Sequence, residues 1–143
     1  MLYDLVRLLH VLAMATWLGA ALWVPGDVKR TLAGGGDAAA LRARGRPAML
    51  LDLFAGIATV ITGLALAGLH GAMRTGLMIG SGVGLVLLVV VIAAQWPAWT
   101  RIAARLDAGD LAGARAGAGR LAAVSGIAHV LWLAALVLMV LPV

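Results

Sequence analysis

The sequence contains no cysteine and no glutamate, and charged residues occupy only 12% of its 143 positions. Without cysteine there can be no disulfides, thiolate metal sites, iron–sulfur clusters or cysteine nucleophiles. A soluble domain of this length would carry about a quarter charged residues. The scarcity of charge and a hydrophobic content of 64% exclude a coiled coil, a disordered chain and an ordinary soluble enzyme. Any metal must then be held by His or Met, or within a porphyrin.

Four long runs contain no Asp, Lys or Arg, at residues 8–26, 53–73, 75–100 and 121–143. About 20 apolar residues in a helix span the bilayer core, and backbone in lipid must satisfy its own hydrogen bonds. The runs are too long for membrane strands and do not alternate. We predict an all-α fold, an integral membrane antiparallel four-helix bundle in one domain over 1–143. Its helices are expected at about 2–25, 48–70, 76–98 and 120–142.

Most of the positive charge is concentrated in two connections. Nine of the 11 basic residues lie in or beside the loops 26–47 and 99–119. The positive-inside rule predicts that both loops are cytoplasmic and both termini outside, in a bacterial inner membrane. The basic excess is thus a signal of topology and of contact with the lipid bilayer, and we expect no nucleic-acid binding. Asp4 and Arg7 interrupt the pattern of a cleavable signal peptide, so none is expected.

The two basic connections resemble each other. Residues 37–42 (DAAALR) match residues 110–115 (DLAGAR) at an offset of 73 positions. The preceding Trp and Pro residues also match within one position, namely Trp23 with Trp96 and Pro25 with Pro97. Each connection is therefore expected to hold a short amphipathic helix. The hairpins 1–70 and 77–143 fit a parallel internal repeat, with shared composition as the alternative explanation.

Four ionisable residues lie inside the predicted helices, and such residues are functional candidates by default: His10, Asp52, His70 and His129. Helical spacing places each histidine on a stripe of polar, aromatic or small residues. The stripes are His10, Met14 and Trp17 on the first helix; Asp52, Gly56, Thr59, Gly63 and His70 on the second; Ser125, His129 and Trp132 on the fourth. The third helix carries a close-packing ridge of Gly76, Gly80 and Gly84.

If these stripes converge, the interior of the bundle offers what haem b requires. Imidazoles are strong axial ligands, and bundle interiors commonly hold cofactors. The candidate ligands are His10, His70 and His129, with Met14, Trp17 and Trp132 shaping the cofactor pocket. Room for a flat macrocycle would come from Gly56, Gly63 and Gly126. The chain would then act in electron transfer or redox chemistry, with quinone or another membrane redox protein as partner.

Simpler interpretations stand beside this one. A lone membrane histidine such as His10 often only bonds to a neighbouring helix. His70, at a helix end, can be an interfacial residue, and His129 can be a packed polar residue bonded to Thr or Ser. Asp52 is expected to pair with an arginine of a basic loop. The three tryptophans near the predicted cytoplasmic boundary fit an aromatic belt without a catalytic role: Trp23, Trp96 and Trp99.

Two other functions are open. His70, Met73 and Met78 gather near the second connection, and imidazole and thioether ligands suit copper. A copper-handling or small-solute membrane protein without haem is therefore one alternative. The third helix's glycine ridge suggests the other, a structural subunit of a membrane complex or a homodimer.

Several of these residues also resemble a known family. The segment Arg7-Leu-Leu-His10-Val-Leu-Ala-Met-Ala-Thr-Trp17-Leu-Gly19, followed by Trp23-Val-Pro25, is similar to the first helix of the HemJ-type protoporphyrinogen oxidases and the CopD-like membrane proteins. Arg46-Pro47-Ala48-Met49 resembles the start of their second helix, and Leu69-His70-Gly71 matches a Leu-His pair of that family. The resemblance covers mainly residues 5–71.

The resemblance implies a four-helix membrane protein that binds haem b, with His10 as a ligand. HemJ-type proteins oxidise protoporphyrinogen and pass the electrons to quinone. The resemblance therefore implies that, if this chain is an enzyme, it is an oxidoreductase. This chain departs from the oxidase pattern. It lacks the Lys after the Leu-His pair, the Tyr-His of the third helix and the acidic residue that opens the fourth. The fold and the haem are accordingly expected more firmly than the reaction.

Overall fold

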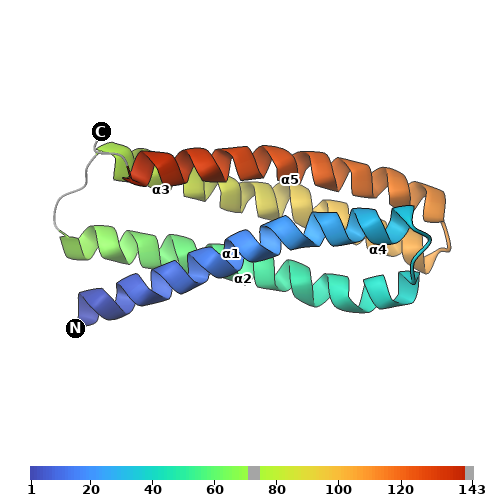
Figure 1. Ribbon diagram of the computed structural model, residues 1–143, viewed down its shortest axis with the longest axis horizontal. Coiled ribbons are helices and arrows are strands. Elements are labelled where there is room, and N and C mark those ends of the chain that lie inside the picture. Colours follow the sequence, from blue (N-terminus) through green and yellow to red (C-terminus); the bar gives the residue numbers. More distant parts are fainter. Residues whose placement is uncertain (71–74, 141–143) are drawn as a thin grey trace.

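The computed structural model describes residues 1–70 and 75–140, and these form an antiparallel bundle with no strand (Figure 1). Four helical rods make up the bundle. They are α1 (Leu2–Ala33), α2 (Ala38–His70), a continuous rod of α3 (Thr75–Val90), the π-helical turn η1 (Val91–Gln95) and α4 (Trp96–Asp107), and α5 (Leu111–Val140). Each rod contains a stretch long and apolar enough to cross a membrane. The predicted all-α four-helix membrane bundle is confirmed.

The helices reach further than the charge-free runs predicted. The expected loops 26–47 and 99–119 are mostly helical, and the actual connections are only Gly34–Asp37 and Ala108–Asp110. The segments expected as separate amphipathic helices are instead continuations of the long rods. Charged residues do not end a helix unless a backbone signal accompanies them. That signal is a glycine in the left-handed region, Gly35 with φ 66° and Gly109 with φ 71°.

Both connections lie at the same end of the bundle, opposite the N-terminus, and we call it the basic end (Figure 1). It carries the arginines and the lysine of the two basic segments. In both connections an aspartate caps the helix that follows. Asp37 accepts the backbone N–H of Ala39 at 2.8 Å, and Asp110 accepts that of Gly113 at 2.8 Å. The residues at offset 73 therefore have the same structural role.

The arginines at offset 73 also have matching roles, because each reaches the opposite hairpin. Arg42 near the start of α2 binds Asp107 at the end of α4, with Nε 3.1 Å from Oδ1. Arg115 near the start of α5 donates from Nε to the carbonyl of Leu32 at the end of α1, at 2.8 Å. Cations beside helix C-termini are favourable because the free carbonyls there are partially negative. The two contacts tie the hairpins together at the basic end.

A π-helical turn joins α3 to α4 without breaking the rod. Pro97 has no N–H to donate to the carbonyl of Ala93 four residues earlier. Just before it, the N–H of Trp96 bonds to the carbonyl of Val91 five residues back, and not to the carbonyl four residues back as in an α-helix. The additional residue in this turn rotates the directions in which the following side chains point. Gln95, at the end of the turn, is buried in the bundle.

The core divides into two clusters along the bundle. The one toward the basic end includes Val28, Leu41 and Ile102, and its largest side chain is Trp99, which is only 2% exposed. The expectation that Trp99 belongs to an aromatic belt is therefore wrong. Its indole lies directly over Gly45 of α2, where any Cβ would overlap the ring. The second cluster surrounds Trp17 in the middle of the bundle.

Candidate functional site

His10 is held by α2 through a specific pair of contacts. Its Nδ1 lies 3.1 Å from the carbonyl oxygen of Thr59 and 3.0 Å from the hydroxyl oxygen of Thr62. A carbonyl only accepts, and the Thr62 hydroxyl already donates to the carbonyl of Ala58 at 2.6 Å. Nδ1 must therefore carry the proton, and Nε2 keeps its lone pair. This tautomer, oriented by a partner on the other nitrogen, is typical of metal-ligating histidines.

Four of the predicted pocket residues surround one small cavity. His10, Met14 and Trp17 of α1 face Trp132 of α5 across a space of about 40 Å³. Gly80 and Gly84 of α3 form another wall of that cavity. The stripes on the first, third and fourth helices thus converge in the bundle.

His129 lies by a neighbouring cavity of about 20 Å³ that shares Trp17, Leu87 and Trp132 with the first. Both indoles therefore line the cavity of His10 and the cavity of His129. The Nε2 atom of His129 is buried and has no hydrogen-bond partner. Unpaired buried polar atoms are costly and rare in folded proteins. His10 and His129 differ accordingly, because the first imidazole is anchored and the second is not.

The glycines of α2 do not leave the room that was expected of them. A Cβ at Gly56 would lie 3.0 Å from Cε2 of Trp17, and one at Gly63 would lie 3.2 Å from Cε1 of His10. The two side chains already fill the notches that the glycines provide. Gly126 is exposed, and a Cβ added there would have no neighbour within 4 Å, so this glycine opens no space in the interior.

Asp52 does not pair with an arginine, contrary to the expectation from sequence. Its side chain is 2% exposed, and its Oδ1 has no hydrogen-bond partner. It occurs 14 positions into α2, as Ser125 occurs 14 positions into α5, so both lie about 21 Å from the basic end. An arginine side chain rooted at the basic end would have to desolvate its guanidinium to reach so deep.

Sequence reasoning missed a polar contact at the same level. The amide Nε2 of Gln95 donates to Oγ of Ser125 at 3.4 Å, and both residues are buried. Gln95 precedes the end of α4 by 12 positions, about 18 Å, which places it near the level of Asp52. A signal was available, because Gln95 is the one amide side chain in the run 75–100. Pro97 indicated an irregular turn nearby, but it did not indicate that the turn would direct Gln95 inward.

Two of the remaining candidates, His70 and Met78, belong to the other end of the bundle. His70 is the last residue of α2, and its side chain lies outside the described residues, as does Met73. Met78 is 57% exposed on α3. Among the described residues, no three His or acidic side chains gather closely enough to hold a metal ion. No contact among the described residues therefore supports the copper alternative.

Comparison with known proteins adds nothing to this geometry, because no family model, curated protein or solved structure matches the chain. The fold and the apolar rods define the class directly: the chain is a helical membrane protein with four helices. The two neighbouring cavities in its middle are lined by two imidazoles, two indoles and a thioether.

Proposed function

We propose that this chain is a membrane-embedded haem b-binding protein that acts in electron transfer or redox chemistry. The observation that carries the proposal is a pair of histidines that line two neighbouring cavities, both of which are also lined by Trp17 and Trp132. His10 presents a lone pair on Nε2, and His129 has an unpaired Nε2. Both belong to the apolar interior of the bundle. Two imidazoles from different helices are a donor set that haem b accepts.

The histidines are suitable donors for haem b, but the cavities between the helices must enlarge before haem b can enter. Cofactor sites enclose roughly 300–1,000 Å³, whereas the two cavities measure about 40 and 20 Å³. We infer that Trp17 and Trp132 turn aside when the group is loaded, since their side chains line both cavities. His10 would be one of the residues that hold the group, and His129 or His70 would be the other. When bound, haem b would supply a one-electron iron couple.

The chain's own residues would orient and insulate the group. Thr59 and Thr62 hold the Nδ1 proton of His10 and thereby orient its Nε2. Met14 and the two indoles exclude water, and low dielectric around the iron tunes its potential. We further place the protein in a bacterial inner membrane with the basic end in the cytoplasm. Quinone is the proposed electron partner, and oxidation of protoporphyrinogen is the reaction that the family resemblance implies.

The direct test is an ultraviolet–visible spectrum of protein purified in mild detergent from haem-replete cells. We expect a Soret band with close to one haem per chain, as measured by pyridine haemochrome. His10→Ala should remove or strongly shift the band, and imidazole in the buffer should restore part of it. Thr16→Val is the matched control, because Thr16 is exposed on α1 and bonds only to its own helix at the carbonyl of Leu12.

The second ligand is found with the same measurement. If His129 is the ligand opposite His10, His129→Ala gives a high-spin spectrum while His70→Ala does not. The reverse result assigns His70. A colourless preparation that added hemin does not redden would overturn the proposal, as would an unchanged spectrum in His10→Ala.

A further inference from the structure

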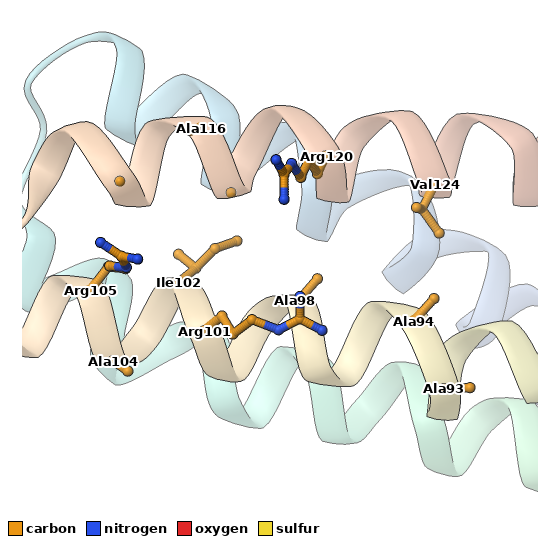
Figure 2. A pocket seen from close by; sticks show the side chains of 12 residues that line it. Ala93, Ala94, Ala98, Arg101, Ile102, Ala104, Arg105, Ala116, Arg120 and Val124 are labelled. Carbon is orange, nitrogen blue, oxygen red and sulfur yellow. The ribbon is translucent and has the colours of Figure 1, made fainter.

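We propose that the groove between α4 and α5 at the basic end is a binding site for an anionic phospholipid. The groove encloses about 620 Å³, far more than the interior cavities. Its walls are mostly alanine and glycine, and the guanidinium groups of Arg101, Arg105 and Arg120 lie along it (Figure 2). This inference is independent of the haem proposal, because the groove contains none of the histidines.

The positive charges in the groove favour the binding of an anion. Arg105 bonds to Asp110, so its charge is partly neutralised. Arg101 and Arg120 have no acidic partner among the residues that the structure describes. Two unpaired guanidiniums on facing helices can share one phosphate, which accepts several charge-assisted hydrogen bonds.

The depth of each wall residue matches the layers of a bilayer. The rod Thr75–Asp107 has 33 residues and is about 50 Å long, whereas the hydrocarbon core is about 30 Å thick. A centred rod therefore extends about 10 Å beyond the hydrocarbon core at each end, through the headgroup layer. Arg105 and Arg101 lie about 3 and 9 Å from the end of α4, and Arg120 about 13 Å from the start of α5, within reach of the headgroups by its long side chain.

The deeper part of the groove suits an acyl chain. Ala93, Ala94 and Val124 line it at about 20 Å from the basic end, inside the hydrocarbon layer. Near the mouth of the groove, the small residues Gly113, Ala116 and Gly117 leave space beside α5. The groove is thus basic at its mouth and apolar at depth. A ligand with a phosphate headgroup and acyl chains has the same polarity pattern, whereas a free phosphate uses only the mouth.

Native mass spectrometry of the detergent-purified chain tests the site, with titrations of phosphatidylglycerol and of phosphatidylcholine with the same acyl chains. We expect phosphatidylglycerol to bind about tenfold more tightly than phosphatidylcholine, the ratio that charge-assisted hydrogen bonds produce. Arg101→Gln with Arg120→Gln should abolish this preference. Arg46→Gln is the matched control, because Arg46 is exposed on α2 at the same end and lies outside the groove.

A second variant separates the groove from surface charge. Ala116→Trp fills the groove and changes no charge, so it should weaken phosphatidylglycerol binding to the level of phosphatidylcholine. Glycerophosphoglycerol and inorganic phosphate, which lack acyl chains, should neither compete nor raise the melting temperature. The proposal is overturned if Arg46→Gln has the effect of the double variant, if Ala116→Trp binds normally, or if inorganic phosphate competes as well as the lipid.

Discussion

At the scale of single residues, the bundle depends on glycines that receive a large side chain from the neighbouring helix. Gly45 lies beneath Trp99, Gly56 beneath Trp17 and Gly63 beneath His10. In each case a missing Cβ allows an aromatic ring to approach the backbone of α2. Small residues have this function at many membrane helix interfaces. The three notches fix how α2 packs against its neighbours.

The tightest of these notches gives a sharp prediction about stability. A Cβ at Gly45 would overlap Cη2 of Trp99, so Gly45→Ala should destabilise the protein by about 1–3 kcal/mol through overpacking. Gly119→Ala is the control, since no atom lies within 4 Å of its Cβ position. That change should be neutral or stabilise α5 by up to about 1 kcal/mol through helix propensity. Thermal unfolding in detergent measures both, and equal effects would contradict the packing described for Trp99.

Two aspartates are expected to respond oppositely to the same substitution. Asp27 bonds to Arg44, with its Oδ2 2.8 Å from Nε, whereas Asp52 is buried without a partner. Asp27→Asn should lower the unfolding midpoint because a charged pair is weakened. Asp52→Asn should leave it unchanged or raise it because an isolated buried carboxylate is lost. A loss in Asp52→Asn as large as that in Asp27→Asn would show that Asp52 has a partner in the folded protein.

At the scale of elements, local backbone signals set the turn within each hairpin, where the first helix ends and the second begins. A left-handed glycine ends the first helix, and an aspartate caps the second. At Asp110 the backbone N–H of Gly113 and then the guanidinium of Arg105 lower the pKa of the carboxyl below its ordinary 3.8. Both contacts favour the ionised form. The start of α5 is therefore sensitive to acid.

The direction of that sensitivity follows from the lowered pKa. The stabilisation by Asp110 is complete above the ordinary pKa of 3.8 and is lost as the pH falls through the lower folded value. Asp110→Asn keeps a good capping residue and cannot ionise. We expect this variant to be close to wild type in melting temperature at a pH below the lowered pKa of Asp110, and less stable at neutral pH, where Arg105 loses its partner. An identical pH dependence in the two proteins, measured by circular dichroism, would contradict this role for Asp110.

At the scale of the whole molecule, the arrangement of charge gives the bundle one basic end. Both short connections lie there, and the N-terminus lies at the other (Figure 1). The reciprocal bonds of Arg42 and Arg115 join the two hairpins at this end. Positive charge of this kind is retained on the cytoplasmic side of a membrane.

Because the chain has no cysteine, its orientation can be tested with single introduced thiols. Ala33 and Ala108 are exposed at the basic end, and Thr75 is exposed at the opposite end, so each can be replaced by Cys in turn. In intact spheroplasts a membrane-impermeant maleimide should label Thr75→Cys alone. Permeabilised cells should give labelling at all three positions. Labelling of Ala33→Cys or Ala108→Cys in intact spheroplasts would contradict a cytoplasmic basic end.

Much of the candidate site could be predicted from the sequence, because it depends on periodicity within single helices. The spacing of His10, Met14 and Trp17 places them on one face, and Trp132 meets them in the same cavity. The contacts of His10 with Thr59 and Thr62 could not be predicted, because they depend on how α1 and α2 are rotated against each other. The arginine partner expected for Asp52 failed for another reason: α2 begins at Ala38 rather than at about residue 48, so Asp52 lies about 21 Å from the basic end.

The sequence by itself determined that this is a four-helix membrane protein with charge concentrated at one end. Hydropathy and charge are properties of successive residues and need no knowledge of packing. Only the tertiary structure decided that Trp99 lies over Gly45, that Gln95 meets Ser125, and that a basic groove opens between α4 and α5. Each of these depends on the rotation and register of neighbouring helices. The shapes of many side chains set that packing together, so no local pattern encodes it.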